Sequence, residues 1–195
     1  MFKVPTHPST YELVEKRSRF ITHCECVQNE HEFKNFLSRL KQKYPDARHY
    51  CYGFRIGPLN SAHRGFSDDG EPSGTAGMPI LNVIDHSQFS NVAIIVVRYF
   101  GGTKLGTGGL ARAYSEAAKT ILDTVKWRIF EEQQTIKLSC TFQQEHQLRY
   151  LISQLEGDIL KVDYPKGVVL TIRVTKGVDL TSISFYRTDI DDDRP

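Results

Sequence analysis

Residues 91–125 read NVAIIVVRYFGGTKLGTGGLARAYSEAAKTILDTV, and this stretch decides the fold of the first half of the chain. Its first part, residues 91–100, is an almost continuous apolar run, which is typical of a central strand covered on both faces. A glycine-rich segment follows at residues 101–109. The remainder repeats apolar side chains at helical spacing, at Leu110, Tyr114, Ala117, Ile121, Leu122 and Val125. The pattern predicts a buried strand, a long loop and an amphipathic helix.

The segments before this stretch alternate between strand and helix patterns. Residues 18–27 and 47–56 show the period-two alternation of strands. A helix with a capping-box-like start at Asn29 is expected between them, and a short helix is predicted near residues 79–86. We interpret residues 1–128 as one domain that contains all of these elements.

The second part of the chain, residues 132–195, shows a different order of patterns. A strand pattern, a helix pattern and two further strand patterns follow one another, at residues 135–142, 148–155, 158–164 and 168–174. This β-α-β-β order opens a ferredoxin-like unit. Residues 175–195 are too few for the expected second helix and final strand, and they end in the acidic run Asp189–Asp193. We therefore predict an α+β protein whose ferredoxin-like C-terminal domain is shortened.

Composition excludes several classes of protein. The apolar content is 39% and the charged content 25%, which are ordinary values for a globular protein. No apolar stretch reaches the roughly 20 residues that cross a bilayer, and the N-terminus lacks the apolar region of a secretory signal. The four scattered cysteines fit a reducing compartment and complete no tetrahedral metal site. These features predict a cytoplasmic protein with no membrane partner, no metal and no cofactor.

The glycine-rich segment is the first candidate site. It runs from a buried strand to a helix N-terminus, where free backbone N–H groups and a partial positive charge suit an anion. Arg98 and Lys104 would add fixed positive charge. Residues 106–111 match the dinucleotide pattern G-x-G-x-x-A, but they begin several residues after the strand, and no ribose-binding acid follows. The segment therefore predicts a binding site for a phosphate-like anion.

A second polar loop, residues 64–77, precedes the buried strand and contains Asp68, Asp69 and Glu71. These carboxylates have two interpretations. They could bind Mg²⁺, which prefers oxygen ligands, or they could accept hydrogen bonds from local backbone amides and shape the loop. Because two long polar loops flank one buried strand, we predict that they share a functional surface.

Four stretches of the chain resemble the signature blocks of the YigZ/Impact family, in the same order. They are EKRSRF at residues 15–20, ARHY at 47–50, SDDGEPSGTAG at 67–77 and VRYFGGTKLGTGGLARAY at 97–114. The resemblance implies an N-terminal domain like the second domain of a small-subunit ribosomal protein, with helices on one face of a mixed sheet. It also implies a C-terminal domain like the last domain of the translocating elongation factor.

The resemblance implies a class of role as well as a fold. Eukaryotic relatives regulate translation initiation during amino-acid starvation, by competing for the activator of the responsible kinase. The resemblance therefore favours a binding protein that regulates translation through protein or RNA contacts. The alternative is an enzyme for a phosphorylated or nucleotide ligand, with Mg²⁺ on the acidic cluster. Direct RNA binding is a third hypothesis, against which stand the acidic second half and the lack of an aromatic-plus-basic motif.

The predicted site is a binding site with no assigned catalytic group and no metal. Within its glycine-rich part, Gly108 and Gly109 are expected to serve the shape of the loop more than global stability. Its residues are His49, Asp68, Asp69, Glu71, Ser73, Thr75, Arg98, Tyr99, Lys104, Thr107, Gly108, Gly109 and Arg112.

Overall fold

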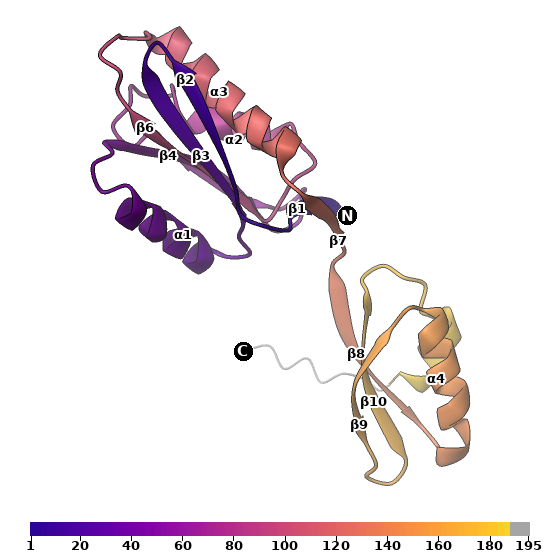
Figure 1. Ribbon diagram of the computed structural model, residues 1–195. Helices are drawn as coiled ribbons and strands as arrows, with labels where there is room; N and C mark the ends of the chain where they lie inside the picture. The colour runs from indigo at the N-terminus through magenta and orange to yellow at the C-terminus, as the bar shows by residue number, and fades with distance from the viewer. Residues whose placement is uncertain (188–195) are drawn as a thin grey trace. The chain divides into compact units, whose positions relative to one another are not determined.

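The computed structural model describes residues 1–187, and the chain divides into two compact units after Phe130. The first unit is built on a five-stranded sheet in which every neighbouring pair of strands is antiparallel (Figure 1). Across the sheet the strands are β2 (Ser9–Glu15), β3 (Ser18–Cys26), β6 (Val92–Tyr99), β4 (His49–Ile56) and β5 (His63–Ser67).

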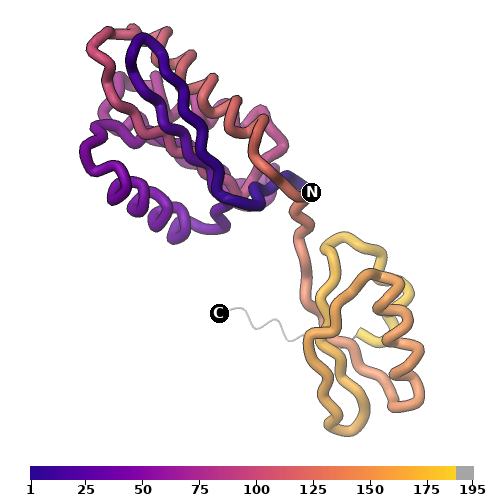
Figure 2. Tube along the Cα trace, viewed as in Figure 1, coloured from indigo at the N-terminus to yellow at the C-terminus, as the bar shows by residue number. Residues whose placement is uncertain are grey.

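The central strand is β6, as its apolar run predicted, and it is buried on both faces. Val92, Ile94 and Val96 pack under α2 (Gly77–Asp85) and α3 (Thr107–Thr124). The side chains between them pack under α1 (Glu30–Lys43), on the opposite face (Figure 2). The implied mixed sheet with helices on one face is therefore wrong. A strand that is apolar on both faces requires helices on both sides.

The first turns of α1 and α3 differ in whether a side chain caps their free N–H groups. The Asn29 side chain caps α1 by accepting the N–H of Glu32 at 2.9 Å, as the sequence predicted. α3 begins after Gly106, a glycine with a φ of 75° that offers no side-chain cap. The first turn of α3 thus keeps N–H groups that no capping side chain satisfies.

Some strands were not predicted from the sequence. β1 (Phe2–Pro5) pairs with β7 (Trp127–Phe130) and joins the two ends of the first unit. β2 and β5 are the edges of the large sheet, and many of their side chains are exposed. Such short, partly polar strands lack the apolar run that marks a buried strand.

The second unit contains the predicted β-α-β-β order, which confirms the α+β class. Its strands form an antiparallel sheet in the order β8-β10-β9, and its core includes Leu138, Leu148 and Leu170. The elements are β8 (Gln133–Cys140), the 3-10 turn η1 (Phe142–Gln144), α4 (Glu145–Gln154), β9 (Asp158–Asp163) and β10 (Val168–Thr175).

After β10, the described chain contains one 3-10 helix, η2 (Thr181–Tyr186), and then a single antiparallel bridge between Arg187 and Leu138 of β8. Between the end of β10 and residue 187 this unit has no second α-helix. The acidic run Asp189–Asp193 lies outside the described residues. No helix within residues 1–187 is both long and apolar enough to cross a membrane.

Candidate functional site

Arg98 and Glu71 form a buried ion pair at the end of the sheet where the two polar loops meet. Arg98 Nη1 lies 2.6 Å from Glu71 Oε1, and the side chains are only 6% and 3% exposed. The Tyr114 hydroxyl, from α3, donates to the same Glu71 oxygen at 2.8 Å. Arg98 Nη2 donates to Ser18 Oγ at 3.2 Å. These contacts connect β3, β6, α3 and the loop after β5.

The structure corrects the predicted role of Arg98. Its guanidinium neutralises Glu71 and lies over the Phe20 and Phe100 rings, 5.3 and 5.7 Å from their centroids. A guanidinium in this position is part of the framework. It is not available to bind a phosphate from solution, because the buried carboxylate already takes its charge.

Asp68 shapes the loop after β5. Its Oδ2 accepts the N–H of Gly74 at 2.8 Å, and its Oδ1 accepts those of Ala76 and Gly77 at 3.0 and 2.8 Å. The last two amides belong to the start of α2, so the carboxylate also complements the positive end of that helix.

Asp69 and Thr75 have similar internal roles. Asp69 Oδ2 accepts the N–H of Tyr50 at 2.6 Å, and the Asp69 carbonyl accepts the Nδ1–H of His49 at 2.9 Å. Thr75 is buried and donates to a main-chain carbonyl of its own loop at 2.6 Å, whereas Ser73 is exposed. Of the two interpretations of the acidic cluster, loop shaping is the one that these contacts support.

The Mg²⁺ interpretation is contradicted by where the carboxylates point. Asp68 and Asp69 bind different backbone amides, and Glu71 binds Arg98. Among residues 1–187, no group of three or more His, Cys, Asp or Glu side chains is arranged to hold a metal ion.

Two buried side chains that sequence reasoning missed complete this network. Cys51 Sγ donates to the Asp68 carbonyl at 2.8 Å and lies 3.3 Å from the Tyr114 hydroxyl. Burial raises the pKa of the Cys51 thiol and of the Tyr114 hydroxyl well above their ordinary values. Both groups therefore remain protonated donors at neutral pH. Tyr114 was visible in the sequence only as a member of the apolar helix face.

The glycines that shape the second loop are not the predicted pair. A Cβ on Gly101 would overlap the backbone of Arg17 and Ser18, and Gly102 and Gly106 have φ values of 85° and 75°. Gly108 and Gly109 have helical backbone in the first turn of α3, and a Cβ on Gly108 would meet open space. The positions that require glycine, Gly101 for its close approach and Gly102 and Gly106 for their positive φ, thus all precede α3.

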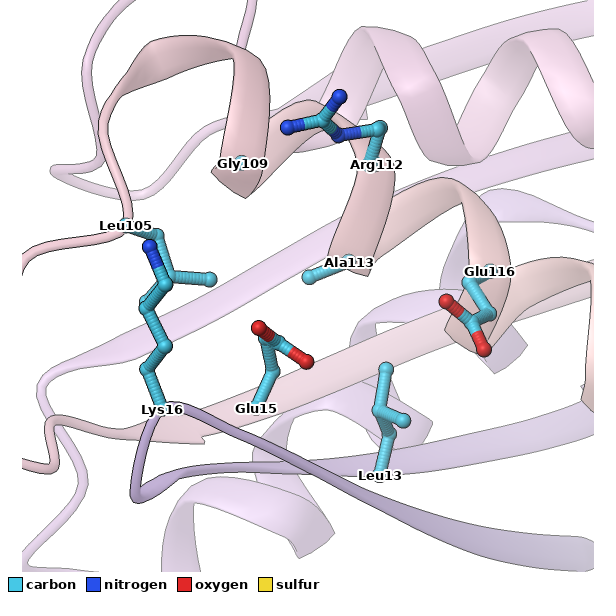
Figure 3. A pocket seen from close by; sticks show the side chains of 8 residues that line it. All are labelled: Leu13, Glu15, Lys16, Leu105, Gly109, Arg112, Ala113 and Glu116. Atoms are coloured by element: carbon cyan, nitrogen blue, oxygen red, sulfur yellow. The ribbon is translucent and has the colours of Figure 1, made fainter.

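Four of the predicted residues, Arg98, Tyr99, Gly109 and Arg112, line two small pockets. Figure 3 shows Lys16 extending from the β2–β3 turn toward Leu105, and Arg112 extending from α3 toward Gly109, at the edge of the first pocket. This pocket is a cavity of about 220 Å³ lined by Leu13, Glu15, Lys16, Leu105, Gly109, Arg112, Ala113 and Glu116. Lys104 and Thr107 are exposed in the adjoining loop and helix start.

The second pocket lies at the ends of β4 and β6. It has a volume of about 280 Å³ and is lined by Asp46, Arg48, Arg98, Tyr99 and Phe100. Tyr99 is half-buried and also lies under the Arg19 guanidinium, at 5.8 Å from its ring centroid. Tyr99 thus belongs to this pocket, whereas Lys104 and Thr107 lie beside the first one.

Comparison with known proteins identifies the family. A family profile described as the Impact N-terminal domain matches residues 16–122. The chain belongs to the Impact family. An IMPACT family member from Haemophilus influenzae is 35% identical over 97% of this chain and 90% of its own length. The Impact family member YigZ from Escherichia coli is 36% identical over 87% of this chain and 83% of its own.

A solved structure has the same fold as this Impact-family chain. It is described as a crystal structure of a hypothetical protein, and it is 35% identical, with a TM-score of 0.69. The match covers 89% of this chain and 84% of the other. Residues 16–122 contain both polar loops, the central strand and nearly all of the four stretches that suggested the family. The candidate site therefore lies within the Impact N-terminal domain.

Proposed function

We propose that this chain is a binding protein that regulates translation. Its binding surface is the end of the five-stranded sheet where the two polar loops meet. Membership of the Impact family supports the role in translation, since the resemblance implies that role for eukaryotic relatives. The partner is a translation-related protein or RNA, met in the cytoplasm.

One observation carries the choice of a binding surface over a catalytic site. The acids and the arginine of the two loops, Asp68, Asp69, Glu71 and Arg98, all bind groups of the protein itself. They hold the loops in shape and are not presented to a ligand. What this framework presents at the surface is a set of cations, including Lys16, Lys104 and Arg112.

Two groups that the alternative, a phosphate-handling enzyme, would need are not available: the Arg98 guanidinium for phosphate and the acidic cluster for Mg²⁺. Arg98 is paired inside the protein, and the acidic residues do not converge. What supports a simpler anion contact is the uncapped first turn of α3, where the N–H groups of Thr107, Gly108 and Gly109 lie near Lys104. We retain a phosphate-like anion at this helix start as a contact within a larger binding surface.

The test is affinity capture from a translation-active bacterial extract. Purified chain is compared with Lys16→Ala/Lys104→Ala, in which two exposed charges are removed without loss of a buried contact. Arg98→Ala is unsuitable, because it would leave Glu71 buried and unpaired. We expect the wild-type chain to retain a translation component and the variant to retain much less. Recovery of no translation component by the wild-type chain would contradict the proposal.

A further inference from the structure

A set of exposed cations, with the half-buried ring of Tyr99 and the exposed ring of Phe100, surrounds the end of the sheet at which the polar loops meet. We call it the basic strip. Its members come from the β2–β3 turn, the start of β4, the end of β6, the glycine-rich loop and α3. They are Lys16, Arg17, Arg48, Tyr99, Phe100, Lys104 and Arg112.

Packing of the backbone brings two parts of the strip together. Lys16 and Arg17 form the two-residue β2–β3 turn, with φ values of 46° and 66°. Gly101 lies directly against Arg17, which brings the glycine-rich loop to the turn (Figure 2). Lys16 of the turn and Arg112 line the first pocket, and Arg48 and Phe100, which precedes the glycine-rich loop, line the second.

The strip carries net positive charge. Within residues 1–187, none of its five cations has a carboxylate within 4.0 Å. Three acids face it: Glu15 and Glu116 in the first pocket and Asp46 in the second. Of the loop acids, Glu71 is neutralised by Arg98. Asp68 and Asp69 keep their negative charge, but their carboxylates are directed at backbone amides. The N-terminus of α3 adds roughly half a positive charge.

Phe100 adds an aromatic surface to this charge. Its side chain is 54% exposed. The guanidinium of Arg98 lies near the ring, 5.7 Å from its centroid. Exposed aromatic rings beside cations are the usual elements of surfaces that bind single-stranded nucleic acid, where bases stack on the rings and phosphates contact the cations. Aromatic rings also occur in protein interfaces, so an acidic polypeptide is included in the test below as the competing occupant.

We infer that the basic strip binds single-stranded nucleic acid. Phosphates contact Lys16, Arg48 and Lys104, and an unpaired base stacks on Phe100. The inference rests on the proposed function and names the ligand class of the same surface. A duplex is excluded from the inference, because its stacked bases offer no free face to Phe100.

Fluorescence anisotropy with a labelled 12-nucleotide RNA of mixed sequence tests the inference directly. The strip variant is Lys16→Ala/Arg48→Ala/Lys104→Ala. The matched control is Lys119→Ala/Lys126→Ala/Arg128→Ala, which also removes three exposed charges. The strip lies at the start of α3, whereas Lys126 and Arg128 follow its end. Because this helix is roughly 27 Å long, these two control charges lie far from the strip. Single-stranded DNA of the same sequence, duplex RNA and polyglutamate are tested as competitors.

We expect the wild-type and control proteins to bind the RNA with matching affinity and salt dependence. The strip variant should bind at least tenfold more weakly, and its salt slope should fall by about 2, since each phosphate contact to a single strand contributes about 0.7. Phe100→Ala should weaken binding about five- to hundredfold with an unchanged slope, and Phe100→Trp should restore it. The single strand that competes better, RNA or DNA, is the preferred ligand of the strip.

Four results would each overturn the inference: no binding of either single strand at low salt, equal loss in the control, no effect of Phe100→Ala, or equal competition by polyglutamate. The last result would assign the strip to an acidic protein. If RNA binding fails while capture from the extract still depends on Lys16 and Lys104, the inference is wrong and the proposed function stands.

Discussion

Arg98 and Glu71 are 27 positions apart in the sequence, yet Arg98 Nη1 and Glu71 Oε1 lie 2.6 Å apart inside the first unit. The pair joins the end of the central strand to the loop after β5. It explains why two charged residues of the family's signature blocks are absent from the exposed surface. Ser18 Oγ extends this network to the glycine-rich loop, because it accepts from both Arg98 Nη2 and the Gly101 N–H.

Glu71→Gln should destabilise the first unit by about 3–5 kcal/mol, because Arg98 would remain buried without a counter-charge. The measurement is denaturant unfolding followed by the fluorescence of Trp127, the chain's single tryptophan. Glu116→Gln is the matched control, since Glu116 is exposed and forms no ion pair with any other residue of 1–187. It should change the free energy of unfolding by less than about 0.5 kcal/mol. Equal midpoints for the two variants would show that the buried pair does not stabilise the fold.

Stability should fall between pH 6.5 and pH 4 because of His23. Burial, with a smaller effect of Lys43, lowers the pKa of His23 from 6.5 to about 4, and the ring is held between Thr10 Oγ1 and the Tyr44 hydroxyl. As the pH falls through 6.5, the unfolded chain takes up a proton that the folded chain does not, so the folded state loses stability.

The loss attributable to His23 should be about 2 kcal/mol after allowance for solvent screening. His23→Gln keeps polar atoms in the same position but does not titrate. The free energies of unfolding of both proteins are compared at pH 7 and pH 4.5. We expect a smaller loss in the variant, and an identical loss would assign the pH dependence to other groups.

Alanine at Gly101 and at Gly108 should have opposite effects on stability. At Gly101 the new Cβ would overlap the backbone of the β2–β3 turn, so we expect a cost of about 1–3 kcal/mol or more. At Gly108 the Cβ would meet open space within a helix, where alanine is favoured over glycine by about 0.5–1 kcal/mol. Thermal melting of the two variants checks both signs. A destabilising Gly108→Ala would contradict the placement of this glycine in the open first turn of α3.

Mg²⁺ should not stabilise the protein. Asp68 and Asp69 are used by backbone amides, and Glu71 by Arg98. The melting temperature in Mg²⁺ should therefore equal that in EDTA. A rise in Mg²⁺ that Asp68→Asn abolishes would revive the metal interpretation of the acidic cluster.

The elements that the sequence could predict are those with strong local signals. The apolar run of β6 is long enough to identify a central strand, and Asn29 marks the start of α1 through its own side chain. β5 could not be found in this way, because its residues, HRGFS, form an edge strand that gains its order from pairing with β4.

The composition of the site depends on contacts between distant segments. No local pattern shows that Arg98 faces Glu71 rather than solvent, or that Cys51 contacts Tyr114. The basic strip could not be predicted from the sequence either, because it also brings distant segments together. Its cations stand at positions 16, 17, 48, 104 and 112, so no stretch of sequence contains the aromatic-plus-basic motif that the fold assembles.

Reporter synthesis in a translation-active bacterial extract tests whether the chain regulates translation through its basic strip. Equal amounts of the wild-type chain, the strip variant Lys16→Ala/Arg48→Ala/Lys104→Ala and the control Lys119→Ala/Lys126→Ala/Arg128→Ala are added, after matched melting curves have established that all three are folded. We expect the wild-type chain and the control to change the rate of reporter synthesis equally, and the strip variant to have little effect. A strip variant as active as the wild-type chain, or three proteins that all leave the rate unchanged, would contradict the account.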